Sequence, residues 1–436
     1  MALLSPGRLT ISEYGAPRRL SADAEELGLS AGQLRDLLER AGVRLEATVV
    51  VKAPLQISGD WWSVQDVAGL VRLSPTLELE IVPKFLHPDD PTWREDFFAV
   101  ATLVRFGRIL PREALRASQG KRGDLADLIG HALCEMYDRN RARPLWVYRR
   151  REWNSFEIEG EIEPESVFLP EEDGFAQSDI RLDRQNTWNW AIHQAMQVLL
   201  PEVKSGDVRR KLGERRAHLS PQNVRPRSLS KRLLPSRHRR WQNLYDLSLS
   251  VLDGFGVALS PGSALAPGYV LKTADAWEAL LLMALRSGLP ECEVAKRPHD
   301  FGVRETLRAD GTIARSRAAQ VMPDATIVFP DGFVLPVDAK YKGRFTEGTT
   351  QPPISATDLY ESVAFMSAMN VARIVLIYPQ RAQGSVQTGH AVPFEQILVE
   401  GKKVIGVTLD VRGIAKGDGF RRFASGSAEI ANQLRA

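Results

Sequence analysis

The segment from Asp324 to Lys340 constrains the fold of this chain more than any other. Two largely apolar runs, residues 324–329 and 333–340, are separated by Pro330-Asp331-Gly332, which is typical of a tight turn. The pattern predicts the two antiparallel strands of a hairpin. The second run is apolar enough to predict a buried strand, so other elements must cover it.

Helical patterns lie on both sides of this predicted hairpin. Thr273 is expected to cap a helix that runs to Leu285. Thr357 or Asp358 is expected to cap a second helix, in which Glu361 lies three positions after Asp358, as in a capping box. The hairpin is therefore predicted to pack between two helices.

Strand and helix patterns divide the chain into three regions. Residues 1–92 alternate apolar and polar positions and predict a strand-rich N-terminal domain that binds a partner, with one helix over 30–41. Residues 93–262 are largely helical, with a strand signal over 155–162. Residues 263–436 follow the order helix, strand, strand, helix, strand, the last strand being 373–378, which predicts a small mixed sheet flanked by helices. The fold class is thus α/β and α+β, with several domains.

Composition excludes several classes of protein. The 436 residues are 44% hydrophobic and 25% charged, which is ordinary for globular domains. Two cysteines, Cys134 and Cys292, lie far apart and belong to no Cys-x-x-Cys pair, so no disulfide framework or zinc site is expected. No signal peptide and no apolar run of about 18 to 20 residues is present, which predicts a cytoplasmic protein without membrane contact.

Two carboxylates and a lysine lie at the open end of the predicted hairpin. Asp338 and Lys340 are two apart in a strand, so their side chains share a face, and Asp324 reaches that face from the partner strand. Hard cations such as Mg²⁺ bind carboxylate oxygens, and a nearby ammonium can orient or deprotonate the attacking water and stabilise the transition state. This combination is suited to phosphodiester hydrolysis. The alternative is that the three residues are ordinary charged residues at a solvated sheet end.

The pattern resembles the PD-(D/E)xK nuclease superfamily. Its motif corresponds to Pro323-Asp324, a gap of 13 residues, and Asp338-Ala339-Lys340. The resemblance implies a restriction-endonuclease-like fold for residues 263–436 and a glutamate on the preceding helix that completes the metal site, here Glu278. Asp324, Asp338 and Glu278 are then the expected ligands of Mg²⁺, with Mn²⁺ as the alternative ion.

Across most of its length, the chain is similar to the McrC family, the nuclease subunits of McrBC modification-dependent restriction systems. The stretches that carry the resemblance are 79–85, 156–162, 323–324, 338–342 and 358–360, in the order of the family. The resemblance implies DNA as the substrate and a McrB-like hexameric AAA+ GTPase as partner, stimulated by the N-terminal region. The chain itself has no P-loop motif.

One position departs from the superfamily pattern. Such nucleases often carry a glutamine and, four residues later, a tyrosine on the helix after the catalytic lysine, whereas this chain has Glu361 and Phe365. Glu361 is expected either to add a metal ligand or to serve as the capping-box residue.

Positive charge is concentrated between Lys204 and Arg240, where 13 basic residues face two acidic ones. Such a segment can follow a DNA backbone. The alternative is a solvated connector that pairs with acidic surfaces of its own chain or its partner. The predicted DNA contacts are Arg209, Arg210, Lys211, Arg215, Arg216, Lys231, Arg232, Arg239, Arg240 and Lys342.

Two further features admit a structural explanation. Of the adjacent Trp61 and Trp62, one ring is expected in the core, although the pair could contact a partner. His299 could lie near the active site but is interpreted as a loop residue.

These features together predict a Mg²⁺-dependent endonuclease subunit of an antiviral restriction complex, in which Asp324, Asp338 and Glu278 bind metal and Lys340 assists the water. Two alternatives remain: an activator of a nucleotide-hydrolysing motor whose nuclease fold is a scaffold, and a stand-alone DNA-repair nuclease. Because one site cuts one strand, double-strand cleavage would require two nuclease domains or complexes to meet.

Overall fold

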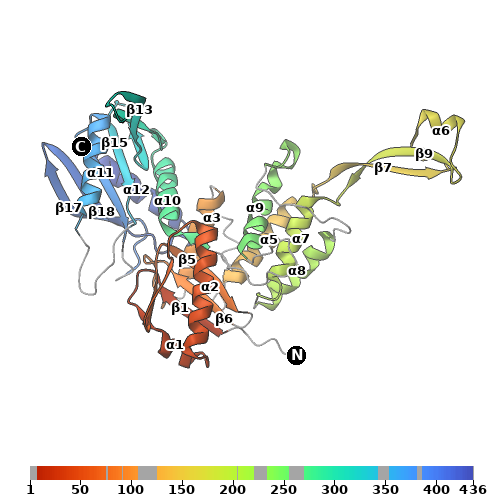
Figure 1. Ribbon diagram of the computed structural model, residues 1–436, viewed down its shortest axis with the longest axis horizontal. Coiled ribbons are helices and arrows are strands. Elements are labelled where there is room, and N and C mark those ends of the chain that lie inside the picture. The colour runs from red at the N-terminus through yellow and green to blue at the C-terminus, as the bar shows by residue number, and fades with distance from the viewer. Residues whose placement is uncertain are drawn as a thin grey trace. The chain divides into compact units, whose positions relative to one another are not determined.

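The chain folds as two units, the second inserted into the first. Residues 1–125 and 267–436 form the first unit and residues 126–266 the second (Figure 1). The expected N-terminal and nuclease regions therefore belong to one unit. The computed structural model describes residues 7–74, 77–90, 92–106, 125–203, 205–219, 233–254, 270–341, 353–380 and 385–435.

β6 (Leu77–Val82) is an inner strand of a four-stranded sheet in the first unit, in the order β1-β6-β5-β10. β1 runs parallel to β6, and β5 and β10 run antiparallel to their neighbours. β10 comes from the chain beyond the inserted unit, so this sheet is assembled from distant segments. The other strands are β1 (Gly7–Ser12), β5 (Val67–Ser74) and β10 (Val270–Lys272).

The alternating pattern of β6 predicts a strand, and the structure confirms it, but the polar positions are buried as well. Glu78 is 5% exposed and Glu80 is 2% exposed. Arg8 Nη2 donates to Glu78 over 3.0 Å, and Arg94 Nε donates to Glu80 over 2.6 Å. Buried carboxylates are tolerated only with such partners.

Two helices and a three-stranded sheet pack with the four-stranded sheet into one apolar core. Ser30 caps the predicted helix in a capping box: Gln33 N donates to Ser30 Oγ over 3.2 Å, and Ser30 N donates to Gln33 Oε1 over 2.9 Å. Trp62 is buried and Trp61 is exposed, which confirms that one ring enters the core. The elements are α1 (Leu20–Glu26), α2 (Ala31–Val49), β2 (Arg18–Arg19), β3 (Leu55–Ser58) and β4 (Trp61–Val64).

The predicted hairpin lies in a six-stranded mixed sheet, in the order β11-β14-β15-β16-β18-β17. β14 and β15 are antiparallel, and β15, β16 and β18 are parallel. The sheet is larger than expected, because β11, β17 and β18 were not predicted. The strands are β11 (Glu293–Ala295), β14 (Ala325–Val328), β15 (Val334–Ala339), β16 (Arg373–Pro379), β17 (Ala391–Val399) and β18 (Lys402–Leu409).

Helices flank this sheet as predicted, but both expected caps are wrong. Thr273 is the first residue of α10 and does not cap it. Ser355 caps α11 by accepting from Asp358 N over 3.1 Å, so neither Thr357 nor Asp358 is the cap. The helices of the first unit are completed by α3 and α12. Their bounds are α3 (Trp93–Phe106), α10 (Thr273–Gly288), α11 (Ala356–Met369) and α12 (Gly419–Arg435).

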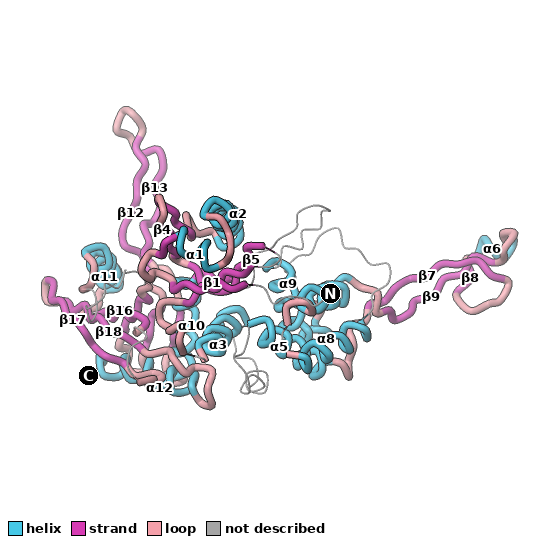
Figure 2. The backbone as a smooth tube through the Cα atoms, turned by 90° about the horizontal axis from the view of Figure 1, so that it is seen from below, coloured by secondary structure: helices cyan, strands magenta, loops and turns pink. Residues whose placement is uncertain are grey.

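A two-stranded hairpin that the sequence analysis missed, β12 (His299–Leu307) and β13 (Ile313–Val321), is inserted between β11 and β14. Figure 2 shows it pointing away from the six-stranded sheet. Both of its faces carry polar residues, so its sequence lacks a one-sided apolar pattern.

The second unit is a group of helices from which a long hairpin extends, formed by β7 and β9 and carrying α6 (Figure 1). None of the described helices of the chain is long and apolar enough to cross a membrane. The elements are α5 (Leu125–Asn140), β7 (Val147–Ser155), β8 (Glu161–Ile162), α6 (Pro164–Phe168), β9 (Phe175–Asp183), α7 (Thr187–Leu199), α8 (Gly206–Leu219), η1 (Ser236–Trp241) and α9 (Gln242–Gly254).

The strand expected over residues 155–162 is wrong for its central part, which is a loop. Gln177 explains why. Its side-chain oxygen accepts from Glu159 N over 2.9 Å, and its nitrogen donates to Ser155 O over 2.9 Å. One side chain thereby supplies the hydrogen bonds that a neighbouring strand would supply.

Candidate functional site

The four residues predicted to be catalytic come from three segments of the first unit. Glu278 lies on α10, Asp324 precedes β14, Asp338 lies on β15 and Lys340 follows it. Register pairs Ala325 with Val337, so the open end of the hairpin brings Asp324 beside the end of β15. Ala339 N donates to Asp324 Oδ2 over 2.9 Å and fixes that approach.

Lys340 is surrounded by carboxylates. Its Nζ lies 2.6 Å from Asp338 Oδ2, 2.6 Å from Glu361 Oε2 and 3.3 Å from Asp358 Oδ1. The side chains of Asp338 and Lys340 are largely buried, whereas that of Glu361 is 50% exposed. One ammonium thus lies within ion-pair distance of three carboxylates, two from α11 and one from β15, the strand that Lys340 follows.

Burial and the neighbouring charges shift the pKa values of Asp338 and Lys340. Burial raises the pKa of Asp338 to about 6, Lys340 opposes that rise and the charge of Asp324 adds to it. Burial acts to lower the pKa of Lys340, but the carboxylates of Asp338, Glu361 and Asp358 outweigh it and raise the pKa above its usual value. Lys340 is therefore protonated at neutral pH and holds a positive charge at this position.

A second lysine, which the sequence analysis missed, links the other two acids. Lys296 Nζ donates to Glu278 Oε1 and lies 3.1 Å from Asp324 Oδ1. Burial raises the pKa of Glu278, and the charge of Asp324 adds to the rise. Lys296 follows β11 directly, and its position in the chain gives no periodic signal that could have identified it.

The cluster has the donor types that a divalent cation requires, but its carboxylates are paired with lysines. Among the residues that the structure describes, no group of three or more His, Cys, Asp or Glu side chains is arranged to hold a metal ion. The negative charge of Asp324 adds to the rise in the pKa of both Glu278 and Asp338, as expected for carboxylates at close range. Carboxylate oxygens under such repulsion fit Mg²⁺, provided that they exchange lysine contacts for the ion.

Tyr341, the residue after Lys340, points into a separate buried cluster. Glu13 Oε2 accepts from the Tyr341 hydroxyl over 2.5 Å, and Glu13 Oε1 accepts from Thr273 Oγ1 over 2.5 Å. Lys84 Nζ donates to the backbone oxygen of Tyr341 and lies 4.1 Å from the centre of its ring. Burial raises the pKa of Glu13 to about 7 and lowers that of Lys84 to about 8.

This buried cluster joins two stretches that are far apart in the sequence. Phe85, which follows Lys84, packs its ring edge-on against Tyr341 with centroids 6.0 Å apart. The stretch 79–85 after β6 therefore contacts the stretch 338–341 after β15. The N-terminal sheet therefore contacts the segment that directly follows the predicted catalytic residues Asp338 and Lys340.

The structure shows the positions of three further residues from the sequence analysis, Glu361, Phe365 and His299. Glu361 is not a capping-box residue, because Ser355 caps the helix and the Glu361 side chain contacts Lys340. Phe365 is buried in an apolar core beside the sheet. His299 begins β12 and is not a loop residue; its Nε2 lies 3.2 Å from Thr326 Oγ1.

The basic residues predicted to contact DNA are largely engaged with their own chain. Arg210 pairs with Asp207 and Glu214, and Arg215 pairs with Asp138. Arg209 donates to a backbone carbonyl, Lys211 pairs with Asp207, and Arg216 donates to Gln197. Arg239 and Arg240 are exposed on η1. Lys231, Arg232 and Lys342 lie outside the described residues.

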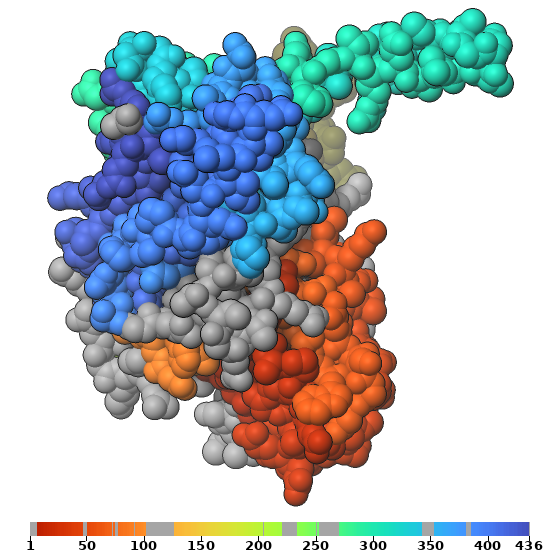
Figure 3. Space-filling view, turned by 90° about the vertical axis from the view of Figure 1, so that its left-hand side faces the viewer, coloured from red at the N-terminus to blue at the C-terminus, as the bar shows by residue number. Residues whose placement is uncertain are grey.

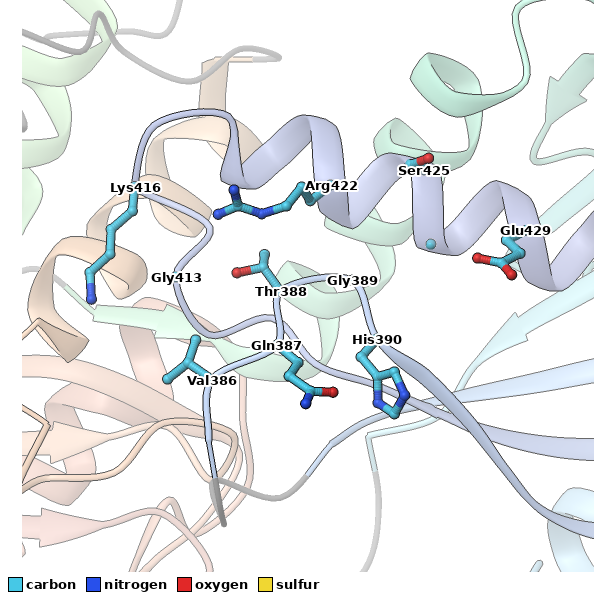
Figure 4. Close-up of a pocket in the computed structure, with 11 residues that line it drawn as sticks. Val386, Gln387, Thr388, Gly389, His390, Gly413, Lys416, Arg422, Ser425 and Glu429 are labelled. Carbon is cyan, nitrogen blue, oxygen red and sulfur yellow. The ribbon is translucent and has the colours of Figure 1, made fainter.

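A cavity of about 560 Å³ lies apart from these residues, between the turn before β17, the loop before α12, and α12 itself (Figure 4). Its charged side chains are Lys416, Arg422 and Glu429, with His390 at its edge. None of the predicted catalytic residues lines it, so the cavity does not bear on the assignment of the site.

Comparison with known proteins identifies the family. Residues 63–379 match the family model described as McrBC 5-methylcytosine restriction system component. A comparison with curated proteins finds no match.

Two solved structures have a similar fold. The first is a refined half-complex from the tetradecameric assembly of Thermococcus gammatolerans McrB AAA+ hexamers with bound McrC; the match has a TM-score of 0.68 at 13% identity and covers 97% of this chain and 100% of that chain. The second is the Thermococcus gammatolerans McrBC complex solved by cryo-electron microscopy, with a TM-score of 0.50 at 13% identity, covering 65% of this chain and 88% of that chain. The family match spans well over half of the sequence and agrees with these folds, so this chain belongs to the McrBC 5-methylcytosine restriction system component family.

Proposed function

We propose that this chain is the nuclease subunit of a McrBC-type restriction complex and cuts DNA with a divalent metal ion. One observation carries the proposal: Glu278, Asp324, Asp338 and Lys340, from segments far apart in the sequence, meet at the end of one strand of the six-stranded sheet. That sheet with α10 and α11 is proposed to be the PD-(D/E)xK fold. Buried charges crowded at a sheet end cost stability, and groups with strongly shifted pKa values cluster at functional sites.

Glu278, Asp324 and Asp338 would hold the metal ion. A bound Mg²⁺ or Mn²⁺ supplies a Lewis acid for the phosphoryl oxygen and lowers the pKa of a bound water. The two lysines screen the acids from one another while the metal is absent. Because Lys296 contacts two of the proposed ligands, we expect its ammonium to be displaced from them if an ion binds there.

Lys340 has a narrower role than the sequence suggests. The surrounding carboxylates raise its pKa, so it is protonated at neutral pH and cannot accept a proton from water. Its ammonium instead stabilises the negative charge that develops on the phosphate in the transition state. Asp338 holds that ammonium in place at 2.6 Å.

The partner is proposed from the similar structures. A chain with this fold occurs in an assembly of McrB AAA+ hexamers with bound McrC, so we expect a hexameric AAA+ GTPase to bind this chain and to be stimulated by its N-terminal region. The pairing of the acids with lysines is the observation that favours a second candidate, in which the nuclease fold is only a scaffold for activating that motor.

Plasmid cleavage in Mg²⁺ tests the assignment. The purified chain is incubated with methylated and unmodified plasmid, with and without the proposed AAA+ partner, and compared with Asp338→Asn. The matched control is Asp331→Asn, an exposed aspartate at the turn of the same hairpin. We expect cleavage by the wild type and by the control, and a loss of more than about 100-fold in Asp338→Asn.

The two candidate functions predict different results in this experiment. If the wild type cuts nothing under any of these conditions but still raises the GTPase rate of the partner, the scaffold function is correct. Cleavage by purified Asp338→Asn at the wild-type rate would contradict the nuclease site as assigned.

A further inference from the structure

The β12–β13 hairpin is an exposed arm with a firmly held base. His299 contacts Thr326 on β14, and Val321 packs against the apolar core beside α11. Beyond that base every residue from Phe301 to Ala318 is exposed. Figure 3 shows the arm in blue-green, standing out from the surface.

The pairing of the two strands places three arginines on one face of the arm. Arg304 is paired with Arg317, and Thr306 with Arg315. Paired residues of an antiparallel ladder share a face, and so do residues two apart in one strand. One face of the arm therefore carries Arg304, Arg315 and Arg317.

The opposite face, called the apolar face below, carries the large apolar residues of the arm together with the acidic Glu305. Val303, Glu305 and Leu307 alternate with the arginines of β12 and lie on the other side of the ribbon. Ile313 pairs with Leu307 beyond a register shift that interrupts the alternation after Arg315, so we place it on this face with Leu307. Within this arm, which the structure describes throughout, no acidic side chain lies on the arginine face between the base and the turn.

The three arginines have no internal partners among the described residues: none of them makes a hydrogen bond or an ion pair with another part of the described chain. Two of them, Arg304 and Arg317, stand directly opposite each other, which is unfavourable for like charges in a strand pair. This contrasts with α8, where Arg210 and Arg215 are paired with acids. The arginine face is thus available to an external anion.

The arm begins and ends at the proposed catalytic cluster. Lys296 lies three residues before β12, and Asp324 lies three residues after β13. A polymeric substrate whose phosphate reaches Asp324 therefore passes the base of the arm. Strands of nine residues span about 30 Å at roughly 3.4 Å per residue, which is close to one turn of B-DNA at about 34 Å.

We propose that the arginine face of the β12–β13 arm binds the backbone of duplex DNA beside the cleavage site. The occupant is a double helix because the charge is spread along an extended ribbon and the major groove admits a two-stranded ribbon. Each guanidinium can bind one phosphate through two hydrogen bonds. The proposal rests on the proposed nuclease function but concerns binding, which can be measured without cleavage.

Binding is measured by fluorescence anisotropy of a labelled 30-base-pair duplex, without divalent metal and over a series of salt concentrations. All proteins are the full chain with Asp338→Asn. The test variant is Arg304→Ala/Arg315→Ala/Arg317→Ala, and a Lys triple variant at the same positions keeps the charge. The control is Val303→Thr/Leu307→Thr/Ile313→Thr on the apolar face. All these positions are exposed, so thermal melting is expected to stay unchanged.

We expect the Ala triple variant to bind at least about tenfold more weakly and to lower the slope of log affinity against log salt by about 3, one for each phosphate contact. The Lys variant keeps the slope, and the Thr control binds like the parent protein. Unchanged affinity and slope in the Ala variant, or no measurable binding by the parent, would overturn the proposal. So would loss of AAA+ partner binding with intact DNA binding, because the arm would then be a protein contact. A wild type that binds DNA through the arm but never cuts it would refute only the nuclease function.

Discussion

Lys340 and Tyr341 are consecutive residues whose side chains enter two different polar clusters. The cluster around Lys340 is rich in charge and reaches the surface through Glu361, which is half exposed. The cluster around Tyr341 is buried, and its groups satisfy one another as donors and acceptors. Because consecutive side chains at the end of a strand point to opposite faces, the proposed catalytic groups are separated from the groups that attach the N-terminal sheet to β15. The predictions below test whether the two clusters are separate in function.

The largest effect is expected from Lys340→Gln. Removing the ammonium takes away a charge that the transition state needs, so cleavage should fall by about 100-fold or more. The measurement is single-turnover plasmid cleavage with the AAA+ partner present. Tyr341→Phe in the same assay should keep cleavage within about tenfold. Equal losses in the two variants would show that the clusters do not act separately.

Tyr341→Phe should instead lower the stability. The change removes the hydroxyl that donates to Glu13 Oε2, while Thr273 still donates to Oε1, and the loss of one hydrogen bond to a buried carboxyl costs about 1 to 3 kcal/mol. Urea denaturation measures the free energy of unfolding. Tyr360→Phe is the matched control, because Tyr360 is 73% exposed and should change stability by less than about 0.5 kcal/mol. A control that costs as much as Tyr341→Phe would refute the assignment of the buried cluster.

Glu13 should make stability depend on pH. Burial raises its pKa in the folded chain to about 7 from an ordinary 4.5. An acid with a raised folded pKa stabilises the fold most at low pH, and this stabilisation is lost as the pH rises from about 4.5 through about 7. The free energy of unfolding should therefore fall by about 1 kcal/mol or more from pH 5 to 7. Glu13→Gln, which cannot ionise, should show a flatter profile; identical profiles would show that Glu13 is not the group responsible.

The smallest effect is expected from Glu361→Gln. Its carboxylate is half exposed, and ion pairs at such positions contribute less than about 1 kcal/mol. Cleavage should change by less than about fivefold, measured as for Lys340→Gln. A loss near 100-fold would instead identify Glu361 as a metal ligand, the other role that the sequence allows.

The strand pattern predicted the centre of the site well. Period-two alternation places Asp338 and Lys340 on one face, and the turn at 330–332 returns Asp324 to them, so local rules sufficed. Their chemical roles remain predictions. Lys296 was missed because it lies in an irregular segment and acts through contacts with residues distant in the sequence.

Tertiary contacts account for most of the other differences. Thr273 looks like a helix cap, but its hydroxyl donates to Glu13, which no local pattern reveals. The basic segment was judged by its charge alone, whereas the structure shows that several of its arginines are paired, including Arg210 and Arg215. The arginines of β12 and β13 are fewer and were overlooked, although they have no partners among the described residues. The number of charged residues in a sequence segment does not show which of them are unpaired in the folded chain and can bind an external anion.

The position of β10 in the N-terminal sheet has a consequence for how the chain folds during synthesis. Residues 270–272 supply the edge strand beside β5, and Thr273 and Tyr341 donate the two side-chain hydrogen bonds to the carboxyl of Glu13. The ribosome adds about 5 to 20 residues per second, so the edge of β5 waits roughly 10 to 40 s for its partner. During that interval the whole inserted unit is made, and β5 presents an open edge to other chains. A nascent chain of this architecture should depend on protection of that edge more than a chain whose sheet is complete at its start.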